Sequence, residues 1–463
     1  LALVAAPQRP DGDVTLFGMD ELLATIARAP DDDVPRFVLA NQLEEHGDKW
    51  GELIVTSCEL AAYTREGRRW DARAVELVDR CHALQRERFP QDKIQCVFER
   101  GFCKRIFLFG GDLAQLEGPA FALIDEVDAF AATVPMLLAL AAWPRLASVS
   151  KLKVRVRDGA NTGFATLDVI ARAARATHVA LAGGELDSSD LRSILARRPE
   201  LRGVACSRLG LSQQLADMPW PDLETLDLSA CQLTAPDVDA LLASEKLHDL
   251  QTLNLGFNRL DAAAAATIAR GPFSRLTHLE LGGNKLGVAG IEQLAASPTL
   301  AGLTALQIGG NDEDLAGALP LFAAAFPRLD TLALKLERPV RGLSEIARSY
   351  RELDLHLVSP DLDDLATLLA HPALRSLHRL RLKLESSEIG EPLSGEPLGA
   401  AIAAARLPGL ANLVLDCRLD EDAACALARA EHLPHDLQLT LDDPIELGIG
   451  RSQLQARFPL SFL

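Results

Sequence analysis

The sequence is poor in aromatic residues and in basic charge. Only 5% of its 463 residues are aromatic, with 2 Tyr and 4 Trp, and the 65 Asp and Glu residues outnumber the 47 Lys and Arg residues. The resulting net charge of -18 argues against general affinity for nucleic acid or for anionic lipid. We therefore expect neither a nucleic-acid partner nor a membrane partner.

Patterned cysteines and long apolar runs are also missing. The 8 cysteines include no CxxC pair and no metal-ligand spacing. No apolar run reaches a membrane-spanning length, and the apolar start LALVAAPQRP is too short for a signal peptide. Cys206 and Cys231 are expected to be packing thiols in a reducing compartment, which predicts a cytoplasmic location.

What the sequence does contain is a repeated phrase. LETLDLSACQL, from Leu223, returns as LQTLNLGFNRL from Leu250, with leucine at places one, four, six and eleven. The Leu-x-Leu core has the two-residue period of a strand with one buried face. Further copies begin at Ala176, Leu201, Leu276, Leu303, Leu329, Tyr350, Leu377 and Leu410, and the steps between Leu223, Leu250, Leu276, Leu303 and Leu329 are 27, 26, 27 and 26 residues.

A helical pattern follows each of the regular phrases. Thr234 and Asp261 are placed to cap helices, and Ile291 and Leu294 form an apolar stripe. A single strand-and-helix unit cannot bury its own apolar face, so copies must stack into a curved solenoid with the strands on the concave side. The fold class predicted is α/β, a horseshoe preceded by a small α-helical domain.

These phrases resemble the leucine-rich repeat family, in its ribonuclease-inhibitor-like subtype, over roughly Val149 to Leu441. The family usually has asparagine or cysteine at place nine, where the side chain satisfies backbone groups as the chain leaves the strand. Here that place holds Cys231, Asn258, Asn284 and Asn311, and later Glu337, Val358, Glu385 and Arg418. We expect the later repeats to be less regular, and their backbone groups to need water or a neighbour.

The segment before the repeats has a helical character. Apolar patterns lie around Leu22 to Ala27 and Phe37 to Leu43, Asp31 to Asp33 form a helix start signal, and a further helix is expected from Arg73 to Arg88. LLATIARAPDDDVPRFVLANQLEEHGDKWGELIVTSCELA and ERGFCKRI, residues 99 to 106, resemble the bacterial repeat-companion domain of myxobacteria and planctomycetes. Ala40 to Glu45 departs from that family's Ala-Asp-Trp-Leu-Glu-Glu. The resemblance implies organisation and no chemistry.

These patterns predict five segments along the chain. They are a flexible N-terminal segment at 1–17, a helical companion domain at 18–90, a transitional or capping segment at 91–145, the leucine-rich repeats at 146–445 and a C-terminal cap or tail at 446–463.

The spacing of the candidate residues in the sequence does not fit a catalytic site or a metal site. Asp11 to Asp13 and Asp31 to Asp33 lack the spacing of a calcium loop. The Gly-Gly pairs after three strand phrases are expected to serve close packing. His178, His278 and His378 fall on different repeats, so they cannot join Cys206 or Ser207 in one nucleophilic site. We predict no catalytic residue, no metal and no cofactor.

The outward-pointing places three, five and seven are the candidate binding surface. In the middle repeats the residues at these places are polar and acidic, and in the late repeats they become basic. Two other segments stay open: the arginine-rich run 65–73, as a solvated connector or a docking site for an acidic partner, and the insertion 385–399, as a binding rim or a plain loop. The predicted partner-binding residues are Asp227, Asn254, Phe257, His278, Glu280, Lys335, Glu352, Asp354, Arg379, Arg381 and Lys383.

The function predicted from this pattern is a non-catalytic scaffold that binds a protein partner through the concave face or the rim. The identity of the partner and the oligomeric state stay open. A regulatory activator of a partner enzyme such as a GTPase is the main alternative, and a hydrolase in its own right is a third. A further alternative is that the surface charges have no role in binding and only keep the solenoid soluble.

Overall fold

The computed structural model divides the chain into two compact units. The first comprises Leu1–Val154 with Arg172–Ala176, and the second Arg155–Ala171 with Thr177–Leu463. The residues that the structure describes are 18–65, 72–89, 93–156, 163–183, 187–211, 215, 217–311, 321, 325–336, 343–358, 361–385, 401–402, 405, 407–416, 421–430, 433–434, 437–441, 454, 457–458 and 460–462.

The first unit starts with four helices and continues with strands. The helix start predicted at Asp31 to Asp33, and the helix predicted from Arg73, are confirmed. Its elements are α1 Met19–Arg28, α2 Val34–Glu45, α3 Trp50–Arg65, α4 Ala72–Arg88, β1 Ile94–Glu99, β2 Phe102–Leu108, η1 Leu113–Leu116, η2 Pro119–Phe121, β3 Glu126–Ala132, α5 Val134–Ala142, η3 Pro144–Ser148 and β4 Lys151–Val156.

Helix α3 was not predicted as an element of its own. It packs against both α2 and α4, so it buries residues on several sides instead of along one stripe. Trp50, Leu53, Ile54 and Cys58 on one side are each at most 2% exposed, and Thr56 and Tyr63 on the opposite side are buried as well. A helix enclosed in this way has little amphipathic period, which is the signal that sequence analysis depends on.

The Arg-Gly-Phe element joins the β1–β2 turn to these helices. Gly101 has φ +83°, and a Cβ there would lie 2.6 Å from the Ile54 Cα, so only glycine fits. Its carbonyl accepts a hydrogen bond from the Trp50 Nε1 at 2.7 Å. The guanidinium of the buried Arg100 donates to the Pro30 carbonyl and to Asp31 at 3.2 Å. This element is therefore structural.

The three aspartates before α2 act mainly through ion pairs. Asp32 accepts a hydrogen bond from the Val34 N–H at 3.0 Å, which forms an Asx turn one residue before the N-cap position. Asp33, in contrast, makes no side-chain cap bond and pairs with Arg65 at 2.5 Å and with Arg36 and Arg100 at 3.6 Å each. The predicted solvated turn is thus a partly buried charge cluster.

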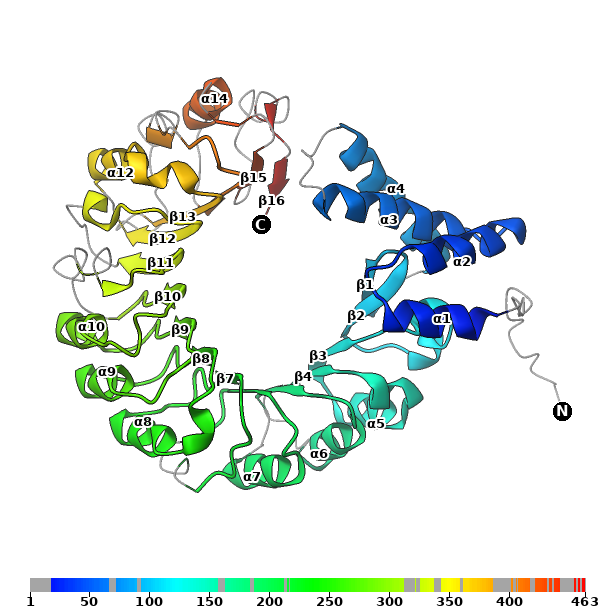
Figure 1. Cartoon of the computed structure of the whole chain (residues 1–463), viewed down its shortest axis with the longest axis horizontal. Helices are drawn as coiled ribbons and strands as arrows, with labels where there is room; N and C mark the ends of the chain where they lie inside the picture. The colour runs from blue at the N-terminus through cyan, green and yellow to red at the C-terminus, as the bar shows by residue number, and fades with distance from the viewer. Residues whose placement is uncertain are drawn as a thin grey trace. The chain divides into compact units, whose positions relative to one another are not determined.

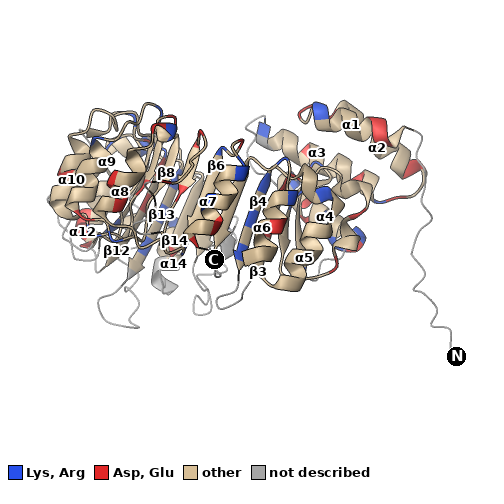
Figure 2. Ribbon diagram, turned by 90° about the horizontal axis from the view of Figure 1, so that it is seen from below, with Lys and Arg blue, Asp and Glu red and all other residues tan. Residues whose placement is uncertain are grey.

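The strands of the first unit follow one another in space as they do in sequence. β1 and β2 are antiparallel, and β3 pairs parallel to β2. Along β4 the buried Leu152 and Val154 alternate with Lys151 and Lys153, and Figure 2 shows the resulting basic stripe on this strand. Lys153 and Arg105 both contact the Glu126 carboxylate, at 2.8 and 2.7 Å, and these attractions hold the pKa of Glu126 below its usual value despite burial.

The second unit is a stack of strand-and-helix repeats, with the strands along the inner side of the curve and the helices along the outer side (Figure 1). Its strands are β5 His178–Ala182, β6 Gly203–Ser207, β7 Thr225–Asp227, β8 Thr252–Asn254, β9 His278–Glu280, β10 Ala305–Gln307, β11 Thr331–Leu336, β12 Glu352–Val358, β13 Arg379–Glu385, β14 Asn412–Asp416, β15 Gln438–Leu441 and β16 Leu460–Phe462. Its helices are α6 Gly163–Arg172, α7 Ser188–Arg197, α8 Ala235–Leu242, η4 Glu245–Leu247, α9 Ala262–Ala269, α10 Gly287–Ala295, η6 Leu343–Ile346, α12 Leu362–Leu369, η7 Pro372–Ser376 and α14 Glu421–Arg429.

The parallel ladder confirms the α/β solenoid predicted from the period. Consecutive strands pair in register, as in Leu226 with Leu253 and Leu253 with Leu279. The leucines at places one, four, six and eleven of the first two phrases are at most 1% exposed. Each buried leucine contributes about 1.5–3 kcal/mol to folding, so this core fixes which residues face outward.

The asparagines at place nine tie neighbouring repeats together, as predicted. The Asn284 side chain accepts from the Asn258 N–H and the Leu260 N–H, each at 3.1 Å. It donates to the Leu255 carbonyl of the preceding repeat at 3.0 Å and to the Leu281 carbonyl of its own repeat at 2.8 Å. Asn258 and Asn311 make equivalent bonds, and Cys231 donates its thiol to the Cys206 carbonyl at 2.8 Å.

Where place nine holds neither asparagine nor cysteine, in the late repeats, the strands are longer. β7 to β10 have 3 residues each, whereas β12 and β13 have 7. Their pairing continues to Val358 opposite Glu385, so a neighbouring strand satisfies the backbone groups. In the 21-residue step after Leu329, the helical element among the described residues is the short η6.

We expect Asn284→Ala to lower the free energy of unfolding by at least about 2 kcal/mol, because it leaves several buried backbone groups without their partner. Urea denaturation followed by circular dichroism measures the loss. Gln307→Ala, on the exposed strand face, is the control and should change stability by less than about 0.5 kcal/mol. Equal effects of the two substitutions would contradict the structural role of the asparagine.

Candidate functional site

Places three and five of the repeats form two continuous rows on the concave side of the second unit. The strand registers align every member of each row with the next. Place three carries Thr225, Thr252, His278, Ala305, Thr331, Glu352 and Arg379, and place five carries Asp227, Asn254, Glu280, Gln307, Ala333, Asp354 and Arg381.

At the acidic end of place five, two predicted binding residues also organise their own turns. The Asp227 carboxylate accepts from the Ser229 N–H at 2.8 Å, and the Asn254 side chain accepts from the Gly256 N–H at 2.9 Å. Asn254 also donates to Asp227 at 3.1 Å. The short Asx spacing, Asp-x-Ser and Asn-x-Gly, is the sequence signal for these bonds.

Glu280 lies beside this pair. Burial raises the pKa of its carboxyl above the usual value, and the negative charge of Asp227 adds to the rise. The acidic centre is therefore held in a partly desolvated state in which its charge is costly.

The basic end of the rows is an alternating lattice of charges. The Arg381 guanidinium contacts Asp416 on β14 at 3.1 Å and Asp354 on β12 at 4.0 Å. Arg379 lies 4.0 Å from Glu352. Burial raises the pKa of Asp354, while Arg381 and Arg379 oppose this rise. Asp416 was missed in the sequence because its partner lies one repeat away.

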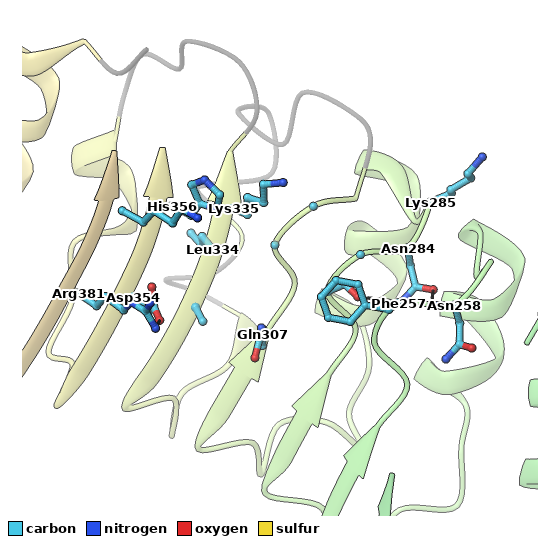
Figure 3. Close-up of a pocket in the computed structure, with 16 residues that line it drawn as sticks. Phe257, Asn258, Asn284, Lys285, Gln307, Leu334, Lys335, Asp354, His356 and Arg381 are labelled. Carbon is cyan, nitrogen blue, oxygen red and sulfur yellow. Dashed lines mark hydrogen bonds and ion pairs between the residues drawn. The ribbon is translucent and has the colours of Figure 1, made fainter. Parts of the chain in front are cut away.

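An open pocket of about 470 Å³ lies on the concave side between β8 and β13. Figure 3 shows Phe257 at one end and Lys335, His356 and Arg381 on the extended strands at the other. Its floor is made by the Gly-Gly pairs of places seven and eight, where a Cβ on Gly309 would come within 2.5 Å of Lys335. The close packing predicted for these pairs is confirmed, but the hollow that they leave was not foreseen.

The predicted binding residues divide between this pocket and the surrounding rows. Phe257, Lys335, Asp354, Arg381 and Lys383 line the pocket. The rest lie along the two rows outside it. Gln307, His356, Gly282 and Gly309 also line the pocket, at outward-pointing places, but they were not among the predicted binding residues; Lys285 was not considered.

Phe257 has an unusual backbone for a large residue. At place eight the chain adopts positive φ in four successive repeats: 56° at Ala230, 57° at Phe257, 68° at Gly283 and 70° at Gly310. This conformation is costly for a residue with a side chain. Yet the Phe257 ring is 70% exposed and lies against Gly283. The strain is not repaid by burial.

The candidate catalytic residues do not converge. His178 lies on β5 and His278 on β9, four strands apart, and His378 lies just before β13. Cys206 is fully buried, which raises the pKa of its thiol, and burial raises the pKa of Cys231 to about 11. Neither of these two cysteines forms a disulfide.

Among the described residues, no group of three or more His, Cys, Asp and Glu side chains is arranged to hold a metal ion. No described helix is both long and apolar enough to cross a membrane. Asp11 to Asp13, most of the arginine-rich run 65–73 and the insertion after Glu385 lie outside the described residues.

Comparison with known proteins identifies the repeat. The family model described as Leucine Rich repeat matches residues 275–295, which contain β9 and α10. This stretch is similar to one leucine-rich repeat, and the neighbouring strand-and-helix units of the second unit stack on it in the same parallel solenoid. No curated protein matches the chain.

Two solved structures share part of this arrangement. The Rad7 and Elc1 complex of yeast matches at 15% identity and a TM-score of 0.34, over 59% of this chain and 82% of that chain. An internalin (inlF) from Listeria monocytogenes matches at 16% identity and a TM-score of 0.36, over 71% of this chain and 93% of that chain. At these values neither likeness bears on what this chain binds.

We expect Phe257→Gly to leave the free energy of unfolding unchanged or to raise it by about 1 kcal/mol, because glycine adopts positive φ without strain. Chemical denaturation measures the change. Gly310→Ala is the matched control: its Cβ would meet nothing closer than the Lys335 Cδ at 3.5 Å, so the cost of about 1 kcal/mol should be conformational. A large destabilisation by Phe257→Gly would show that the ring is a structural residue.

The raised pKa of Glu280 predicts that the stability of the folded protein depends on pH. The folded protein holds this proton more tightly than the unfolded chain, so stability is lost as pH rises from the ordinary value of about 4.3 through the folded pKa. Glu280→Gln should gain stability relative to the wild type as the pH rises above the ordinary value of about 4.3. Glu292→Gln, exposed on α10, removes the same charge and should not gain. Parallel pH profiles for Glu280→Gln and the wild type would contradict the prediction.

Proposed function

We propose that this protein is a non-catalytic scaffold that binds a protein partner through the concave face of its second unit. The observation that carries the proposal is the register of places three and five from β7 to β13. Because the leucines take the core positions, these two rows form one continuous surface of variable, largely polar side chains.

Electrostatic complementarity is the proposed basis of recognition. Asp227 and Glu280 make one part of the face acidic, whereas Arg379, Arg381 and Lys383 make the later part basic. Such a sign change selects a partner and its orientation more than it adds affinity. Phe257 supplies the exposed aromatic ring that interfaces commonly use as an anchor.

The non-catalytic part of the proposal rests on the separation of the candidate nucleophiles and bases. A nucleophile needs a base within hydrogen-bond reach, whereas the histidines predicted from sequence lie on different repeats and the Cys206 thiol is enclosed. The buried thiols of Cys206 and Cys231 support a reducing compartment such as the cytoplasm.

We further propose that the helical part of the first unit is a repeat-companion domain and that the repeats are of the ribonuclease-inhibitor-like subtype. The structural use of Gly101, and the contacts of Arg100 with the aspartates before α2, support the first assignment. The α-helices that follow β7, β8 and β9 support the second.

Site-specific photo-cross-linking in lysate of the source organism tests the proposed face. A photoreactive phenylalanine analogue replaces His278 or Arg379, both exposed on the concave side, and in a control replaces Glu292, exposed on α10. We expect the two concave positions to capture the same protein and the control position not to capture it. Capture only from Glu292, or equal capture from all three positions, would overturn the concave-face assignment.

A further inference from the structure

The pocket between β8 and β13 exists because five places along it have little or no side chain. Gly282 and Gly309 occupy seventh places, Gly283 and Gly310 the eighth places that follow them, and Ala333 the adjoining fifth place. The glycines cannot be enlarged without conflict: a Cβ on Gly309 would lie 2.5 Å from the Lys335 backbone nitrogen, and one on Gly282 would lie 3.0 Å from the Gly309 carbonyl. The hollow is therefore part of the stacking geometry.

The length of this pocket suits an extended chain. From β8 to β13 the sheet advances by five strands, which at about 4.8 Å per strand is roughly 24 Å. An extended peptide advances about 3.3 Å per residue, so roughly seven residues would span it. A single phosphate or carboxylate would contact only a small part of that length.

The early end of the pocket offers an apolar contact. Phe257 is 70% exposed and sits in a left-handed conformation that its neighbours reach with alanine or glycine. Its ring rests over Gly283, where a Cβ would come within 2.6 Å of it. A strained and exposed aromatic residue indicates a function other than folding.

The late end of the pocket gathers positive charge. Lys335, His356 and Lys383 occupy the seventh place on β11, β12 and β13 and are directly in register. Arg381 adds a guanidinium whose position is fixed by Asp416 at 3.1 Å. Asp354 also lines the pocket and lies 4.0 Å from Arg381, so the excess positive charge at this end is carried by Lys335 and Lys383. The complementary ligand therefore carries negative charge at this end.

We propose that the pocket binds an extended acidic segment of a protein partner. An apolar side chain of the segment packs on Phe257, and carboxylates four to seven residues away contact the cluster of Lys335, His356 and Lys383, about 14–24 Å away across the strands. This inference deepens the proposed concave-face function and rests on it.

Selection from a displayed library of random peptides of about twelve residues, longer than the roughly seven-residue pocket, tests the proposal on the whole protein. Before selection, the library is incubated with a variant that carries Phe257→Gly, Lys335→Glu and Lys383→Glu, and the peptides that bind this variant are discarded. We expect the remaining peptides to be enriched in Asp and Glu at four to seven positions from an apolar residue. The absence of enrichment, or enrichment of neutral or basic peptides, overturns the proposal.

Binding of the best enriched peptide, synthesised with a fluorescent label, separates the two ends of the pocket. The variant Phe257→Gly should weaken binding by at least about tenfold, and so should the double variant Lys335→Glu with Lys383→Glu. Raising the salt concentration from about 0.05 to about 0.3 M should weaken only the part of the affinity that depends on charge. Arg270→Glu, an exposed charge reversal at the end of α9, is the control and should leave affinity unchanged.

Equal loss with Arg270→Glu, or no loss with the pocket variants, would overturn the assignment. A partner that cross-links at His278 and Arg379 but binds the pocket variants normally would refute the pocket alone and leave the concave-face function standing. Cross-linking confined to Glu292 would refute the concave-face function itself.

Discussion

The constraint on which the second unit depends is that one strand-and-helix repeat cannot bury its own apolar face. Leucines at fixed places meet this constraint only if each repeat stacks on the next in register, as Leu226, Leu253 and Leu279 do. Once those places are committed to the core, the alternation of the strand leaves places three, five and seven outside. The functional surface is therefore a consequence of the packing rule.

Backbone hydrogen bonds are satisfied in two ways along the solenoid, and the pocket lies where one gives way to the other. In the repeats with Asn258, Asn284 and Asn311 the strand ends after three residues, and the chain turns with positive φ at place eight. From β11 onward the ladder itself continues to later places, which keeps long side chains such as Lys335 on the sheet. Glycine turns on one side and extended basic strands on the other enclose the hollow.

The sequence was sufficient to predict whatever depends on short-range pattern. The buried leucines and the two outward rows follow from the eleven-residue phrase alone, and the asparagine bonds were expected from the resemblance to leucine-rich repeats. Features that depend on neighbours in space were not predicted. Helix α3 has no apolar stripe because it packs against both α2 and α4. The ion pair of Arg381 with Asp416 joins residues 35 positions apart in the sequence. Phe257 was predicted as a binding residue because it is an aromatic residue on the concave face, but its left-handed backbone conformation is visible only in the structure. The assignment of the row residues to partner binding stays a prediction.

Charge gives the concave face a direction. Burial raises the pKa of Glu280 with only another carboxylate, Asp227, acting on it, so added negative charge there would increase an existing cost. At the other end Arg381 is already held by Asp416 and Asp354, which orders its guanidinium before any ligand arrives and reduces the entropy lost on contact. An acidic segment placed in reverse would bring its carboxylates toward Glu280 and away from Lys383. Repulsion at the acidic centre and attraction at the late strands therefore favour a single orientation, with the apolar contact at Phe257 fixing the register between them.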